Sequence, residues 1–176
     1  MRLGRTRMFW VLALVIASAA AARADSPDSS AQQVTGLFMQ SCVQFAGDKE
    51  GLRSWARKIG LKALPAPLQA RFLDGLPGIV FDASNQKGKF VLVSEDGGSC
   101  SAIAERASGT QTIEDLEKDM NTARIGLRMT AAKGDSEEEL EHREYVASLG
   151  DRSWLLLIST VKNAAGGQVM LTATPN

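Results

Sequence analysis

Apolar residues recur at helical spacing through the first part of the chain. Those between Val34 and Phe45 stand three or four positions apart, which predicts an amphipathic helix. Ser30 followed by Gln33 is a capping-box pattern, so we expect the helix to start there and to end at Gly47. Its apolar positions, which include a cysteine, are Val34, Leu37, Phe38, Cys42 and Phe45.

Two more helices are predicted before the pattern changes. Asp48 can cap a helix whose apolar stripe runs from Leu52 to Ile59, and Gly60 stands where a glycine commonly ends a helix. A short helix is expected over residues 67–73, between two prolines and a glycine.

From residue 78 onward the alternation is typical of strands. Turn-forming stretches at 85–88 and 96–99 separate the first runs, and Thr112 with Asp115 predicts one helix after the third run. The strands are expected over 78–84, 89–95, 100–107, 123–131, 142–149, 152–161 and 168–174.

This order of elements predicts an α+β fold. Hairpin-length connections dominate, so we expect a mainly antiparallel sheet of about six strands, three before one inserted helix and three or four after it, with N-terminal helices. The run at 154–161 is apolar on both faces, which favours a central strand. PAS-like and profilin-like sheets share this order of elements, although the analogy carries no function.

The first 24 residues have the three-part pattern of a secretory signal peptide. Three arginines precede a charge-free run over 9–22, shorter than the ~20 residues of a spanning helix, and small residues precede Asp25. We expect cleavage after Ala24, a flexible lead-in over 25–30 and a single α+β domain over 31–176. The protein would then be periplasmic or secreted, with no membrane span.

Loss of this leader changes the charge balance. The whole chain has 20 basic and 20 acidic residues, and removing the four leader arginines leaves 16 against 20, a formal charge of −4. A mildly acidic protein gives no electrostatic basis for binding nucleic acid or an anionic membrane.

Cys42 and Cys100 are the two cysteines of the chain. In an oxidising compartment two cysteines of one exported domain should pair, and the chain-entropy description gives such a bridge about 4 kcal/mol. The alternative is two separate thiols, one of them catalytic, with His142 as its base. A C-x-x-C motif is absent, so a thioredoxin-like redox role has no support, and the oxidising compartment favours the bridge.

The sequence lacks the common motifs of catalytic and cofactor sites, including G-x-S-x-G, the P-loop, H-E-x-x-H and the EF-hand. Zinc sites need several ligands at short spacing, which one histidine and two paired cysteines do not supply. We therefore expect no catalytic residue, metal site or cofactor.

Two polar segments are the candidate binding regions. Asp82, Ser84 and Asn85 stand at a turn where a ligand could be held, although these residue types are also ordinary turn formers. An acidic run could hold a cation or meet a basic partner, and is otherwise typical of a charged hairpin tip. Its candidates are Glu137, Glu138, Glu139, Glu141 and His142.

Several short motifs after the leader resemble those of one group of proteins. A helix with FMQSC is followed by GD, an LP segment, GIVFDAS and SEDGGSCS. In these the chain is similar to small exported proteobacterial proteins with no assigned activity. The resemblance covers residues 35–107, implies export and a Cys42–Cys100 bridge, and implies no catalytic residues.

These observations favour a non-catalytic exported protein that binds another envelope or exported protein, and an immunity-type inhibitor is one concrete form. The alternative is a small-molecule module on a PAS-like sheet, or a hydrolase whose residues converge only in space. A deep apolar pocket would favour the ligand module. A solid core with a patch-bearing surface would favour the partner protein.

Overall fold

The structure, a computed structural model, describes residues 28–134, 140–161 and 166–176. Within them one antiparallel sheet contains eight strands, in the order β1-β2-β3-β4-β8-β7-β6-β5. The strands are β1 (Lys62–Ala63), β2 (Gly78–Asp82), β3 (Phe90–Glu95), β4 (Cys100–Ala107), β5 (Gly126–Gly134), β6 (Leu140–Leu149), β7 (Arg152–Val161) and β8 (Gly167–Pro175). The helices are α1 (Ser29–Phe38), the π-helix η1 (Met39–Val43), α2 (Lys49–Lys58), α3 (Ala66–Leu73) and α4 (Gly109–Thr122).

The predicted α+β class and antiparallel sheet are confirmed, but the expected count of about six strands is wrong. β1 has two residues, which is too short to show any alternation in the sequence. The residues described after α4 form four strands, which pair in sequence order, β5 with β6, β6 with β7 and β7 with β8.

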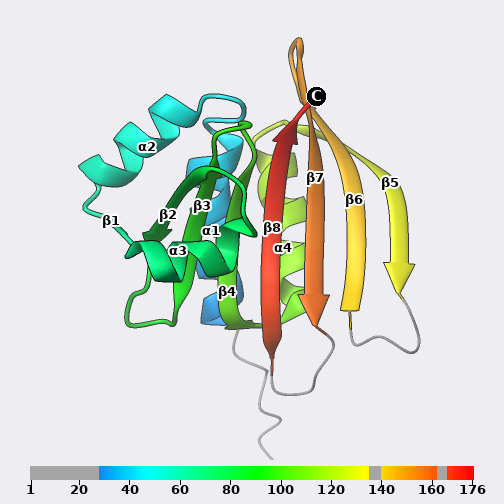
Figure 1. The fold of residues 1–176 in the computed structure, drawn as a ribbon. Coiled ribbons are helices and arrows are strands. Elements are labelled where there is room, and N and C mark those ends of the chain that lie inside the picture. The colour runs from blue at the N-terminus through cyan, green and yellow to red at the C-terminus, as the bar shows by residue number, and fades with distance from the viewer. Residues whose placement is uncertain (1–27, 135–139, 162–165) are drawn as a thin grey trace, which may run out of the picture.

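The sheet consists of two meanders that meet at its centre. The first is β1 to β4 and the second is β5 to β8, and α4 connects them along the chain. β8, the last strand in the sequence, pairs with both β4 and β7, so that Cys100 lies opposite Ala173. In the view of Figure 1, α1 and α4 lie behind the sheet and α3 lies in front of it.

Each face of the sheet has its own apolar cluster. The larger lies under α1 and α4, where alternate residues of β7, namely Trp154, Leu156 and Ile158, are buried. The smaller lies under α3 and contains Leu73 and Val80 with two residues of β3 and β4. We call these faces the α1/α4 face and the α3 face.

Two helix starts differ from the prediction. Asp28 caps α1 by accepting from the Ser30 N–H at 2.8 Å, and its second oxygen accepts from the Ser108 N–H at 2.5 Å. Ser108 in turn caps α4, so the caps predicted at Ser30 and Thr112 are wrong, whereas the cap at Asp48 is confirmed. One aspartate therefore joins the starts of both helices on the α1/α4 face.

The predicted leader and cleavage site lie outside the described residues. Among those that are described, no helix is both long enough and apolar enough to cross a membrane.

Candidate functional site

The predicted disulfide is confirmed. Cys42 in η1 and Cys100 at the start of β4 are joined, with their Cα atoms 5.2 Å apart and both side chains buried. The bond fixes the helical N-terminal segment to the centre of the sheet. Neither cysteine is a free thiol, so the alternative of a catalytic cysteine is excluded in the oxidised protein.

A buried arginine makes a second link between α2 and the sheet. The Arg53 side chain donates from Nε to Ser94 Oγ at 3.1 Å, and from Nη2 to Ser94 O at 2.9 Å and Asp96 Oδ1 at 2.6 Å. Its hydrogen bond to Asp96 holds the pKa of that carboxyl below its ordinary value. The turn between β3 and β4 is therefore fixed at both ends, by Arg53 and by Cys100.

The predicted candidates Asp82, Ser84 and Asn85 lie together in the loop between β2 and β3. Hydrogen bonding from the side chain and backbone of Ser84 lowers the pKa of Asp82, whose Oδ1 accepts from the Ser84 N–H at 2.9 Å. Asn85 accepts from the Lys87 N–H at 2.7 Å. These bonds are those of ordinary turns, yet the same residues line two separate hollows.

The first hollow, which we call the α3 groove, has a volume of about 710 Å³ and lies between α3 and the sheet. Asp82 and Ser84 stand on its rim with Arg71 of α3, and Lys89 forms an ion pair with Glu105 at 3.5 Å. Its apolar lining is Leu64, Leu68, Phe72, Val91 and Ile103.

One glutamine holds α3 in position beside this groove. Gln69 Nε2 donates to Leu64 O at 2.6 Å, and Gln69 Oε1 accepts from the Val80 N–H at 3.1 Å. The carboxamide thus bonds to the backbone on both sides, as a peptide group does in a sheet ladder. The bond to Val80 anchors α3 beside β2.

His142 lies further along the α3 face. Its Nδ1 is 2.9 Å from Ser159 Oγ, and both line a hollow of about 230 Å³ that shares Gln168 with the α3 groove. A serine beside a histidine suggests nucleophilic chemistry. However, Ser159 lies in β7 between two paired strands, where backbone N–H groups belong to the ladder and are poorly placed to stabilise an oxyanion.

The acidic run is not brought together as a cluster in the described residues. Glu137, Glu138 and Glu139 lie outside them. Glu141 precedes His142 in β6 and so points to the opposite face, where its Oε1 accepts from Arg143 Nε at 3.0 Å. Within the described part of the chain no group of three or more His, Cys, Asp or Glu residues could hold a metal ion.

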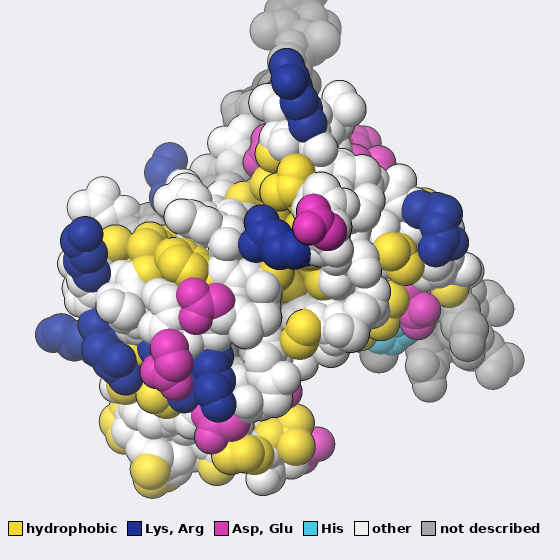
Figure 2. Space-filling view, turned by 90° about the horizontal axis from the view of Figure 1, so that it is seen from above, with side chains coloured by type: hydrophobic (Ala, Val, Ile, Leu, Met, Phe, Trp, Pro, Cys, Tyr) yellow, Lys and Arg dark blue, Asp and Glu magenta, His cyan; other side chains and the backbone are white. Residues whose placement is uncertain are grey.

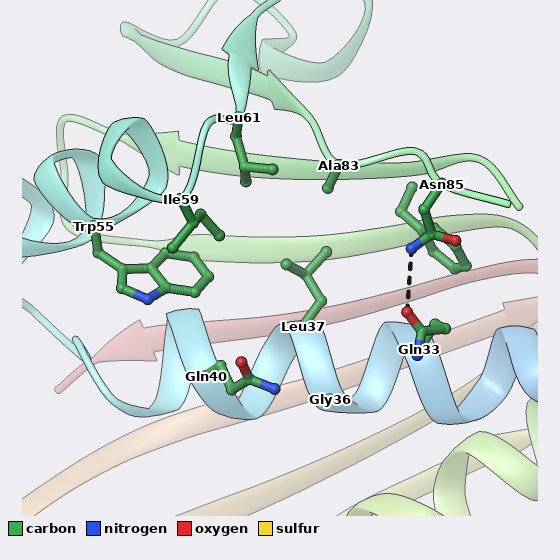
Figure 3. A pocket seen from close by; sticks show the side chains of 10 residues that line it. Gln33, Gly36, Leu37, Gln40, Trp55, Ile59, Leu61, Ala83 and Asn85 are labelled. Atoms are coloured by element: carbon green, nitrogen blue, oxygen red, sulfur yellow. Dashed lines mark hydrogen bonds between the residues drawn. The ribbon is translucent and has the colours of Figure 1, made fainter. Parts of the chain in front are cut away.

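The second hollow, which we call the helix cavity, has a volume of about 220 Å³ and lies between α1, the end of α2 and the β2–β3 loop (Figure 3). Asn85 lines it and donates from Nδ2 to Gln33 Oε1 at 3.1 Å. Gln40 and the half-buried Trp55 also line it. The helix cavity and the α3 groove thus lie on opposite faces of the sheet.

No family model, curated protein or solved structure matches the chain. The similarity to small exported proteobacterial proteins therefore stays a prediction, and a function must be argued from the geometry of the two hollows. On the end of the molecule seen in Figure 2, basic and acidic side chains are interspersed among apolar ones.

Sequence reasoning identified the β2–β3 loop but missed most residues of both hollows. Leu68 and Phe72 of α3, Gln33 of α1 and Gln40 of η1 read as ordinary helix positions in the sequence. They become lining residues through packing between elements that are distant along the chain, for which no local signal exists.

Proposed function

We propose that this protein is a non-catalytic exported binding protein, and that its α3 groove receives an apolar segment of another envelope or exported protein. The observation that carries the proposal is the apolar floor of the groove, left open beside α3 and bordered by charged side chains. An apolar centre with a polar rim is the usual anatomy of a protein-binding site.

The rim favours a protein over a small apolar molecule. Arg71 has no ion pair among the described residues, whereas Lys89 is paired with Glu105. Asp82 stays ionised, because hydrogen bonding with Ser84 lowers its pKa. A partner with charges of both signs around an apolar anchor residue would match this rim.

The open shape supports the same interpretation. Sites for small molecules usually enclose most of their ligand. The α3 groove is instead open to solvent on one side and adjoins, through Gln168, the hollow beside His142. Two neighbouring hollows on one face suit an extended or helical segment, and an immunity-type inhibitor of an envelope-acting toxin remains one concrete form of such a protein.

The test places a charge in the groove and the same charge outside it. Leu68 in α3 is 42 % exposed and lines the groove, whereas Leu76 is 54 % exposed and lies after the helix. Leu68→Glu should reduce recovery of the partner from native periplasmic extract at least ~10-fold, equivalent to about 1.4 kcal/mol. Leu76→Glu should leave recovery unchanged.

The partner identified in this way would then be purified, and its binding to the three proteins measured directly. Melting curves of both variants would show that each is folded. Equal binding by Leu68→Glu and the unmodified protein, or no partner at all, would contradict the proposal.

A further inference from the structure

The helix cavity has walls from three parts of the chain. α1 forms its floor, the end of α2 closes one end, and the β2–β3 loop closes the other (Figure 3). Leu37 projects from α1 towards Leu61 and Ala83, and Trp55 stands at the α2 end. Because the Arg53 bonds and the disulfide fix α2 and η1 to the sheet, these walls are held in place.

The lining combines flat apolar walls with neutral hydrogen-bonding groups. No Lys, Arg, Asp or Glu is among the described residues that line it. The carboxamides of Gln33, Gln40 and Asn85 each carry donors beside an acceptor. Within the described residues, Gln33 Nε2 and the Gln40 carboxamide have no hydrogen-bond partner, so both can serve a ligand.

Gly36 keeps the floor of the cavity open. It lies inside α1, where glycine is less favourable than alanine. A Cβ atom at this position would meet one atom within 4 Å, the Gln40 Nε2 at 3.9 Å, so close packing does not require a glycine. A larger side chain here would enter the cavity, which gives the glycine a role that stability does not explain.

We propose that the helix cavity binds a small neutral aromatic heterocycle whose edge carries a donor beside an acceptor, the chemistry shared by a nucleobase and a nicotinamide ring. The flat ring would lie among Trp55, Leu37 and Ile59. Its edge would meet the carboxamides, which pair with such edges through two parallel hydrogen bonds. The cavity of about 220 Å³ suits one ring system rather than a whole nucleotide.

This site is independent of the α3 groove. The two hollows share no lining residue, and they lie on opposite faces of the sheet. The test of partner binding and the test of heterocycle binding can therefore fail independently of each other.

The test follows the indole N–H signals of Trp55 and Trp154, two of the three tryptophans of the chain, by NMR of the oxidised protein during titration with adenine and nicotinamide at millimolar concentration. Trp55 lines the cavity, so its signal should shift as ligand is added and reach a plateau when the site is full. Trp154 is 2 % exposed in the core and should not shift, which makes it an internal control. Toluene, a ring without a polar edge, and glucose, a neutral ligand without a flat ring, complete the set of probes.

Substitutions in and near the helix cavity test whether the ligand binds there. Gly36→Leu fills the cavity and should abolish the Trp55 shift, whereas Gln32→Leu puts the same side chain on an exposed position of α1 and should preserve it. Gln33→Met removes one carboxamide at similar size and should weaken adenine binding several-fold. Gly36→Ala adds a single methyl group, should melt no lower than the unmodified protein and should weaken binding.

Several outcomes would overturn the proposal. They are no Trp55 shift with either heterocycle, unchanged binding by Gly36→Leu, and toluene or glucose binding as tightly as adenine. A lower melting temperature for Gly36→Ala would show that the glycine serves packing instead.

Discussion

At the scale of single residues, Arg53 shows how a charged side chain can be part of a core. It is 7 % exposed, and its guanidinium hydrogen-bonds to Ser94, whose side chain is also buried. Its third bond reaches Asp96 at the surface, so the positive charge keeps a solvated partner. The arrangement avoids the cost of an unpaired buried charge and fixes α2 beside the helix cavity.

Replacing this arginine should destabilise the protein. Arg53→Met retains much of the apolar stem but leaves the Ser94 hydroxyl and carbonyl without their donor, which should lower the free energy of unfolding by about 2–3 kcal/mol. Arg57→Met, on an exposed position of the same helix, should change it by less than about 0.5 kcal/mol. Urea unfolding of both variants measures the difference, and equal midpoints would contradict this account of Arg53.

The same contact predicts a dependence on pH. The Arg53 hydrogen bond lowers the pKa of Asp96 in the folded protein, so the ionised carboxyl favours folding. This stabilisation is complete above the unfolded pKa of about 3.9 and is lost as the pH falls through the lowered folded value. Asp96→Asn should therefore be less stable than the unmodified protein at neutral pH, and the gap should close in acid. Unfolding curves across this range measure the gap, and one that stayed constant would exclude the carboxyl as its cause.

Residue-scale prediction from the sequence succeeded where the signal was local or chemical. The pairing of the two cysteines was predicted from the expectation of an oxidising compartment, and Asp48 before a helical stripe predicted a cap. Arg53 could not be predicted, because it lies off the apolar stripe of α2 and its partners are 41 and 43 residues away. The same limit hid the residues of both hollows.

At the scale of elements, the disulfide joins a short π-helix to the sheet. η1 carries Cys42 directly after α1, and Ser41 Oγ donates to Leu37 O at 2.5 Å in the preceding turn. π-Helical turns are rare and shift the register of the side chains that follow. The turn carries Cys42, which the helical spacing predicted on the apolar face, to the start of β4, where it bonds to Cys100.

Removing this bridge should weaken the fold without changing it. The bond spans 58 positions, for which the chain-entropy description gives about 4 kcal/mol. The double variant Cys42→Ala, Cys100→Ala should unfold at correspondingly lower urea concentration, and reduction of the unmodified protein should have a similar effect. Thiol titration of the unreduced protein provides the control, since it should detect no free thiol. A midpoint that reduction leaves unchanged would contradict a stabilising role.

Element prediction was strongest for isolated hairpins and weakest for pairing across the sheet. The alternation on either side of Asn85–Gly88 predicted β2 and β3, and the turn after Glu95 predicted the start of β4. The pairing of β4 with β8 joins residues such as Cys100 and Ala173 and has no sequence signature. Ile59, the last residue of the apolar stripe predicted for α2, is 51 % exposed beside the helix cavity.

At the scale of the whole molecule, the order of the strands makes folding depend on β8. This strand belongs to the second meander and joins it to the first, with β7 on one side and β4 on the other. The centre of the sheet therefore cannot form until β8 is available to pair with β4 and β7.

A chain that ends at Gly166 tests this dependence. The truncation removes Val169 and Leu171, whose exposed fractions are 1 % or less. It also removes the pairing of β8 with β4 and with β7 at the centre of the sheet. Such a loss is comparable to the whole stability of a domain, about 5–15 kcal/mol, so we expect no cooperative unfolding transition in circular dichroism. Deletion of Asn176 alone removes one exposed hydrogen bond to Ser153 and should leave the transition unchanged. A cooperative transition in the shorter chain would show instead that the remaining seven strands fold without β8.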